Sequence, residues 1–223
     1  KPTGTVYSRD ELRALAEIFA QHPNITIISD EIYEYIQYAG KHESIAQFPE
    51  IKERVVVVNG FSKGFSMTGW RLGYMAAPIG LAKACEKLQS QFTSGANSIT
   101  KRTGITALLS DLGPTYEMTK AFGERRDYFI QALSALPGLK INLPRGAFYA
   151  FPDVSAFFGK SDGAEVIRNA DDLTMYFLNQ AHVTGVSGAA FGDDNCIRFS
   201  FAASMDTLQE GVKRLDAALK RLK

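Results

Sequence analysis

Four consecutive valines at residues 55–58 are followed directly by a stretch rich in glycine, serine and basic residues, residues 60–73. A short β-branched run without polar alternation is typical of a strand buried on both faces, as parallel strands of α/β proteins are. Open α/β sheets bind their ligands beyond the carboxyl ends of such strands. Lys63 lies there between a serine and a glycine, and Arg71 follows eight residues later. The pattern indicates an anionic ligand bound beside a reactive amine.

Short β-branched runs alternate with helical periodicity along the chain, which favours an α/β layer structure. Ser8 and Glu11 form the capping-box pattern that begins a helix, and this helix is predicted to end before His22. Further helices are predicted at residues 80–90, 99–109, 114–136, 171–180 and 205–222. Strands are predicted at residues 25–29, 55–58, 71–77, 139–143, 147–151, 183–186 and 196–202.

The order of elements changes after the long predicted helix at residues 114–136, because strands and helices are mixed from there on. We therefore expect two domains, with the boundary inside that helix. Residues 1–125 would belong to a larger domain with a mostly parallel sheet. Residues 126–223 would form a smaller α+β domain.

Composition and charge exclude several classes of function. A chain of 223 residues with 45% hydrophobic residues is ordinary for a globular protein, and its formal net charge of +1 provides no global field that attracts nucleic acid or an anionic membrane. No apolar run is long enough to span a membrane, and no signal peptide is visible. The two cysteines and three histidines show no metal-ligand spacing, so we expect no metal site and a cytoplasmic location.

Polar and charged side chains of different chemistry stand next to the ends of three predicted strands. Asp30 and Tyr33 follow the first strand, Ser62 and Lys63 follow the valine strand, and Arg71 stands at the start of the next. An amine, a carboxylate, a phenol and a guanidinium at one sheet edge match the needs of pyridoxal 5'-phosphate. Lys63 would form a Schiff base, Asp30 would pair with the ring nitrogen, and Tyr33 would donate to the ring oxygen. Arg71 and Ser62 would bind the phosphate.

Residues 60–73, with the sequence GFSKGFSMTGWRLG, resemble the pyridoxal-phosphate attachment motif of class I/II aminotransferases of fold type I, in the aspartate aminotransferase branch. Residues 1–4 (KPTG), 29–33 (SDEIY) and 196–202 (CIRFSFA) are similar to three further segments of the family. The resemblance spans the whole chain but only the carboxyl-terminal part of the family's fold. It implies that residues 1–125 are the carboxyl-terminal part of the cofactor-binding large domain.

The resemblance also implies a role for each matching side chain. Lys63 would be the Schiff-base lysine and would move a proton between substrate and cofactor. Asp30 and Tyr33 would hold the cofactor ring. The remaining roles would be phosphate binding by Ser62 and Arg71, binding of the substrate α-carboxylate by Arg198, and lining of the substrate pocket by Phe148.

Two positions depart from the family pattern. Lys1 stands where the family has an asparagine that contacts the ring oxygen of the cofactor, and Gly60 stands where some members use a serine for the phosphate. Structural roles also remain open, since Asp30 could cap a helix and Arg198 could be a core arginine with a protein partner.

The resemblance implies an aminotransferase that moves an amino group from an amino acid to a 2-oxo acid, with aspartate and 2-oxoglutarate as the expected pair. It also implies a homodimer, in which residues 93–98 face the neighbouring subunit. We expect the chain by itself to be inactive, because the family's phosphate loop and ring-stacking aromatic precede this part. Two alternatives remain: a carbon–sulfur lyase of the same fold and a non-catalytic module that senses a ligand.

Overall fold

The computed structural model describes residues 2–163 and 165–223, so Lys1, with its departure from the family pattern, lies outside the described residues. Contacts divide the chain into two compact units, Val6–Thr119 and Lys120–Lys223, with Lys1–Thr5 grouped with the second. The division falls within the long helix α4 (Gly113–Ser134). The domain boundary expected after residue 125 lies in the same helix. That residues 1–125 and 126–223 belong to two separate domains stays a prediction.

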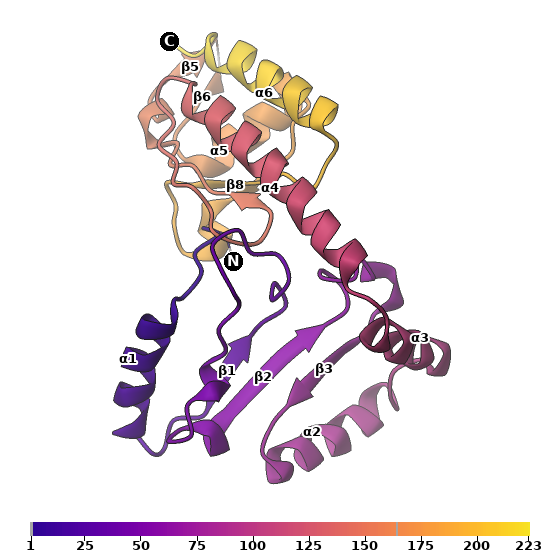
Figure 1. Cartoon of the computed structure of the whole chain (residues 1–223). Helices are drawn as coiled ribbons and strands as arrows, with labels where there is room; N and C mark the ends of the chain where they lie inside the picture. Colours follow the sequence, from indigo (N-terminus) through magenta and orange to yellow (C-terminus); the bar gives the residue numbers. More distant parts are fainter. Residues whose placement is uncertain (1, 164) are drawn as a thin grey trace. The chain divides into compact units, whose positions relative to one another are not determined.

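The first unit is built on a three-stranded sheet with the order β1-β2-β3, labelled in Figure 1. Strand β1 (Ile27–Asp30) pairs in parallel with β2 (Val55–Gly60), and β2 pairs in antiparallel with β3 (Gly73–Ala76). Residues 61–72 join β2 to β3 without a crossover α-helix, as is usual for an antiparallel pair. The sheet of this chain is therefore mixed, and the mostly parallel sheet remains a proposal for the whole large domain.

Helices complete this unit close to where the sequence predicts them. They are α1 (Arg9–Ala20), α2 (Ile79–Phe92), α3 (Ser98–Leu109) and the beginning of α4, with 3-10 turns at Ile45–Gln47, Lys52–Arg54 and Thr68–Trp70. The predicted capping box of α1 is confirmed: Ser8 Oγ accepts the Glu11 N–H at 3.3 Å, and the Glu11 carboxylate accepts the Ser8 N–H at 2.7 Å. The cap satisfies N–H groups that the helix itself leaves unpaired.

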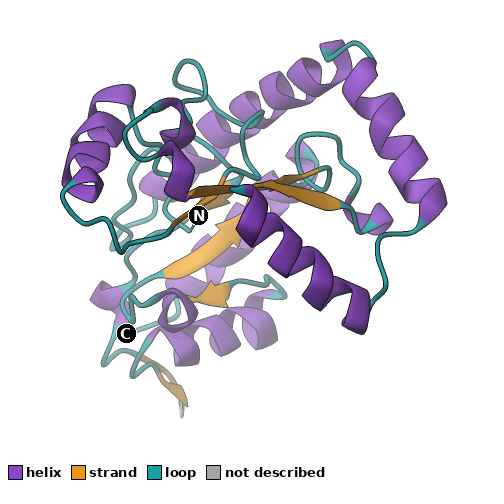
Figure 2. Cartoon of the chain, turned by 90° about the horizontal axis from the view of Figure 1, so that it is seen from below, coloured by secondary structure: helices purple, strands orange, loops and turns teal. Residues whose placement is uncertain are grey.

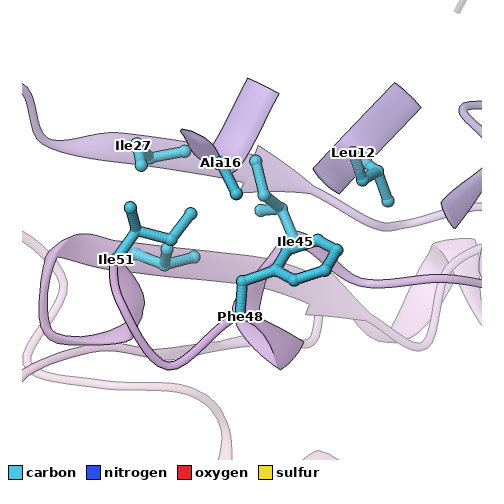
Figure 3. Packing of buried hydrophobic residues seen from close by; sticks show 7 residues of the cluster. Leu12, Ala16, Ile27, Ile45, Phe48 and Ile51 are labelled. Carbon is cyan, nitrogen blue, oxygen red and sulfur yellow. The ribbon is translucent and has the colours of Figure 1, made fainter. Parts of the chain in front are cut away.

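On one face of the sheet, α1 and the segment that contains the first 3-10 turn pack against β1 and β2 (Figure 3). Leu12 and Ala16 of α1 lie in one buried cluster with Ile27 of β1, as helical spacing of apolar residues predicts. Phe48 and Ile51 complete this cluster from the segment between β1 and β2, and both are almost fully buried. An irregular segment thus supplies much of the core under β1.

Phe48→Ala is expected to lower the free energy of unfolding by about 3–5 kcal/mol, because it removes a fully buried ring and leaves a cavity. Urea unfolding followed by circular dichroism measures the change. Ile18→Ala is the matched control, since Ile18 is 52% exposed on α1 and should change stability by less than about 0.5 kcal/mol. Equal losses in the two variants would contradict the assignment of this core.

The second unit combines a small antiparallel sheet with helices, as an α+β arrangement requires, and Figure 2 shows its short strands in orange among purple helices. The sheet has the order β4-β8-β7, and a separate hairpin pairs β5 with β6. The strands are β4 (Tyr149–Ala150), β5 (Ser161–Asp162), β6 (Glu165–Val166), β7 (Val186–Ser187) and β8 (Ile197–Ser200). The helices are the end of α4, α5 (Ala170–Tyr176) and α6 (Met205–Leu219), with a π-helical segment at Phe177–Ala181 and 3-10 turns at Ser155–Phe157 and Gly188–Phe191.

The strand predicted at residues 139–143 is wrong. Only Lys140 pairs there, in an isolated bridge to Asp153. Gly138, with φ of 94°, turns the chain just before this segment, and Pro144, which has no N–H to donate, follows it. These two residues limit the pairing of this segment to the single bridge at Lys140.

Candidate cofactor and substrate sites

The loop between β2 and β3, residues 61–72, closes on itself through its backbone. The Phe61 N–H donates to the Leu72 carbonyl at 3.2 Å, and the Met67 N–H donates to the Phe61 carbonyl at 3.2 Å. Lys63 lies inside this closed loop, where its carbonyl accepts the Ser66 N–H at 3.2 Å. The half-buried lysine is therefore held at the carboxyl end of β2.

Glycines permit the close packing of this loop. A Cβ atom on Gly64 would lie 2.5 Å from the Tyr35 ring, and the Gly64 carbonyl accepts the Thr115 hydroxyl at 3.0 Å. A Cβ atom on Gly60 would lie 2.9 Å from the Leu72 carbonyl oxygen. In this loop geometry, Gly60 therefore serves the close approach of β2 to β3.

Asp30 and Tyr33 lie at the carboxyl end of β1, beside the strand that leads to Lys63. Asp30 is the last residue of β1 and pairs in register with Val58 of β2. Its Oδ1 accepts the Ile32 N–H at 3.3 Å, and the Tyr33 carbonyl accepts the Ile36 N–H at 2.9 Å in the turn that follows. Parallel strands end at the same sheet edge, so β1 and β2 carry these residues and Lys63 to one edge.

Ser62 and Arg71 belong to the same closed loop as Lys63. Ser62 is half-buried directly before the lysine, whereas Arg71 is exposed at the end of the loop. Arg71 has a left-handed backbone conformation, with φ of 52°, and its Nη1 donates to the Thr68 carbonyl at 3.0 Å. A hydroxyl, an amine and a guanidinium thus come from one short segment.

A buried carboxylate that the sequence analysis did not identify lies next to Asp30. Glu31 is 9% exposed, and its oxygens accept hydrogen bonds from Ser29 at 2.9 Å and Ser44 at 2.7 Å, and pair with His42 Nε2 at 2.8 Å. Burial raises the pKa of Glu31, but the hydrogen bonds from His42, Ser44 and Ser29 together hold it below its usual value. The hydrogen bond to Glu31 raises the pKa of His42.

Arg198 lies in the second unit, on β8, with its guanidinium between two aromatic rings. The guanidinium carbon is 4.4 Å from the ring centroid of Tyr149, on the neighbouring strand β4, and 4.4 Å from that of Phe191. Within the part of the chain that the structure describes, no carboxylate forms an ion pair with this half-buried guanidinium. Its planar fork is held by stacking and can donate hydrogen bonds to an external carboxylate.

Phe148 is joined to this aromatic group through Tyr149. Its ring lies 4.9 Å from the Tyr149 ring and 5.3 Å from the Phe122 ring, and its carbonyl accepts the Phe201 N–H at 2.9 Å. Phe148, Tyr149 and Arg198 therefore form one cluster within the second unit.

The structure thus groups the predicted residues in two sets, one in each compact unit. The set in Val6–Thr119 is Asp30, Tyr33, Ser62, Lys63 and Arg71, and the set in Lys120–Lys223 is Phe148 and Arg198. Among residues 2–163 and 165–223, no three His, Cys, Asp or Glu side chains gather as metal ligands would. None of the helices in these ranges has the length and apolar character needed to cross a membrane.

Comparison with known proteins finds relatives along the whole chain. The family model "Aminotransferase class I and II" matches residues 1–215. A bifunctional aspartate aminotransferase and glutamate/aspartate-prephenate aminotransferase of Petunia hybrida is 50% identical over 227 residues, which cover 100% of this chain and 47% of the relative. An aspartate aminotransferase of Pinus pinaster is 46% identical, with 100% of this chain and 46% of the relative covered.

A solved structure shares the fold of this chain and is similar to it in sequence. The aspartate aminotransferase of Rhizobium meliloti superposes with a TM-score of 0.95 at 38% identity, covering 100% of this chain and 56% of that one. The chain spans about half the length of the relatives that it matches. With the family model matched over residues 1–215, this chain belongs to the class I and II aminotransferases, a family of α/β proteins of fold type I.

Proposed function

We propose that this chain is part of a pyridoxal-phosphate-dependent aminotransferase that transfers the amino group of aspartate to a 2-oxo acid, with 2-oxoglutarate as the acceptor. The observation that carries this proposal is the closed loop that holds Ser62, Lys63 and Arg71 beside the strand that ends in Asp30. The family uses this cofactor, and the relatives from petunia and pine carry the name aspartate aminotransferase.

The side chains present fit the cofactor. Lys63 would bind its aldehyde and then carry a proton at the substrate α-carbon, while Asp30 would hold the protonated ring nitrogen and Tyr33 would donate to the ring oxygen. Ser62 and Arg71 would hold the phosphate, since a hydroxyl and a guanidinium are strong donors to it. When bound, the cofactor supplies an electron-poor ring that stabilises a carbanion.

The second set of residues would act on the substrate. Arg198 would bind the α-carboxylate through a bidentate pair, because its fork is already held between Tyr149 and Phe191. Phe148 would line the substrate pocket, since it packs against Tyr149 in the same cluster. Both roles require that the substrate carboxylate binds at Arg198 on β8.

Absorbance spectroscopy tests the proposal on the 223-residue chain and on the longest polypeptide that contains it. The longer polypeptide should bind pyridoxal phosphate with a visible band, and aspartate should convert this band to that of the amine form with release of a 2-oxo acid. The chain by itself is expected to bind the cofactor weakly and to be inactive. Pyruvate and ammonia from a sulfur-containing amino acid would support the lyase instead, and binding without any product would support a sensing module.

Prephenate is a second candidate acceptor, because the petunia relative, 50% identical to this chain, is named a glutamate/aspartate-prephenate aminotransferase as well. The rates of amino transfer from glutamate and from aspartate to prephenate are compared with the rate from aspartate to 2-oxoglutarate. This comparison decides between the acceptors. A measurable rate with prephenate supports a bifunctional enzyme, and the absence of such a rate excludes prephenate as an acceptor.

We also propose that the active protein is a homodimer. Apolar side chains of α2 and α3 are exposed at 62–83% in this chain, which is typical of a surface that contacts further protein. The residues concerned are Ile79, Leu88, Phe92, Ile99 and Leu109. Sedimentation of the longest polypeptide should give twice the monomer mass, and a monomer at assay concentration would contradict this proposal.

A further inference from the structure

The first strand, β1, presents different side chains to its two faces. Ile27 is 8% exposed and Glu31 is 9% exposed, whereas Ile28 between them is 72% exposed. Because successive side chains of a strand point to opposite faces, Asp30 shares the open face with Ile28, and Ser29 shares the covered face with Glu31. Glu31 therefore lies behind the strand end whose open face carries the proposed cofactor ligand Asp30.

Both oxygens of Glu31 are engaged by residues of the covered face. Oε1 accepts the hydroxyls of Ser29 and Ser44, and Oε2 lies 2.8 Å from His42 Nε2. The second ring nitrogen of His42 lies 2.9 Å from the side-chain nitrogen of Gln37. The segment from residue 37 to 44 is thereby tied to the end of β1.

The backbone of Glu31 connects this network to the proposed site. Its N–H donates to the Val58 carbonyl at 2.8 Å and extends the pairing of β1 with β2. Its carbonyl accepts the Glu34 N–H at 2.9 Å and so begins the turn that carries Tyr33. A shift of the Glu31 side chain would therefore move the backbone that orients Asp30 and Tyr33.

We infer that the Glu31–His42 pair is a positioning device, in which protonated His42 holds Glu31 on the covered face and so keeps Asp30 and Tyr33 oriented for the cofactor. The inference rests on the proposed function where its test measures affinity for pyridoxal phosphate. Neither residue touches the reacting atoms, so both would act through Asp30 and Tyr33.

Both protonation states of His42 can donate from Nε2 to Glu31, but only the protonated state adds the attraction of opposite charges. Neutral His42 donates from Nε2 to Glu31 and accepts the Gln37 amide N–H at Nδ1. Protonated His42 donates from both nitrogens, and Gln37 has a buried Oε1 that lacks a partner in the described part of the chain. Half a turn of the Gln37 amide would present this oxygen to Nδ1, in exchange for the 3.4 Å hydrogen bond that Gln37 Nε2 donates to the Glu34 carbonyl.

Charge favours the protonated state. The hydrogen bond to Glu31 raises the pKa of His42, burial opposes it, and the charges of Glu31, Glu34 and Glu43 add to the rise. Because this pKa is raised on folding, the contribution of His42 to stability is fully present below about pH 6.5 and is lost as pH rises through the raised pKa. Glu31 has a lowered pKa, so its contribution is present above about pH 4.5 and is lost in more acidic solution.

The test compares wild-type protein with Glu31→Gln, which keeps the shape of the side chain and removes its charge. Without cofactor, NMR should give a midpoint for the His42 titration. Above this midpoint the protection factors of the Glu31, Ile32 and Tyr33 amides, which correct for the intrinsic rise of exchange with pH, should fall. In Glu31→Gln the His42 midpoint should move to lower pH. Affinity for pyridoxal phosphate at neutral pH should fall about tenfold, a loss typical of partners that orient a ligand-binding residue.

His22→Gln is the matched control, since His22 is exposed and should leave both midpoints and the affinity unchanged. A lower His42 midpoint in Glu31→Gln with unchanged amide exchange and cofactor affinity would overturn the inference. His42→Asn, which removes the titrating group, serves if Glu31→Gln does not fold, and it should abolish the pH midpoint in amide exchange. If the longest polypeptide that contains this chain binds no cofactor in its wild-type form, the proposed function fails, while amide exchange still decides the positioning role.

Discussion

Lys63→Ala is expected to abolish the visible band of bound pyridoxal phosphate and to lower kcat/KM for aspartate on the order of 10⁵-fold. The closed loop between β2 and β3 holds this lysine at the sheet edge that also carries Asp30. A methyl group can neither bind an aldehyde nor carry a proton, and removal of such a group from a catalytic unit eliminates most of the rate enhancement. Spectra and initial rates of the purified active protein measure both effects.

Two further variants separate loss of the amine from loss of structure. Lys63→Arg keeps the positive charge of the loop without a nucleophilic amine, so it should lose the band and the activity as fully as Lys63→Ala. Lys83→Ala changes an exposed lysine of α2 and should retain both. A band that persists in Lys63→Ala would mean that another lysine binds the cofactor. Melting temperatures of both Lys63 variants close to that of wild type would show that unfolding does not cause the loss of activity.

The sequence predicts the parts of the fold that depend on local pattern. The valine run predicts β2 because a buried strand needs no polar alternation, and the observed strand covers Val55–Gly60. The paired signals Ser8 and Glu11 predict the beginning of α1, because both partners of the cap lie within one turn. The loop with Lys63 is also predictable from its residues, because a lysine beside serine and glycine follows a strand and an arginine comes eight residues later.

Other features depend on contacts that leave no period in the sequence. The Glu31–His42 pair joins residues 11 positions apart across an irregular segment, so no spacing rule could identify His42. The hairpin of β5 and β6 was not predicted either, because its residues are mostly polar and each strand has only two. Phe191 stacks on Arg198 from a 3-10 turn, and only the folded second unit brings them together.

Arg198→Lys is expected to lower kcat/KM for aspartate by about 10- to 100-fold, chiefly through a higher KM. A lysine keeps the charge but loses the planar fork and with it one hydrogen bond to the carboxylate, and a hydrogen bond to a charged group contributes about 1.5–3 kcal/mol. Steady-state kinetics with aspartate, and the dissociation constant of a dicarboxylate inhibitor, measure this loss. Arg214→Lys is the control, because Arg214 lies on α6 in an exposed pair with Glu210.

Tyr149→Leu tests whether stacking contributes to the binding role of Arg198. Leucine keeps an apolar side chain on β4 and removes one of the two ring faces that lie 4.4 Å from the guanidinium carbon. A cation–π contact of about 0.5–2 kcal/mol predicts a rise in KM of several-fold with a smaller change in kcat. An unchanged KM in Arg198→Lys would place the α-carboxylate elsewhere. An unchanged KM in Tyr149→Leu alone would mean that Phe191 and the strand suffice to orient the guanidinium, because the pairing of β8 with β4 and β7 already fixes its backbone.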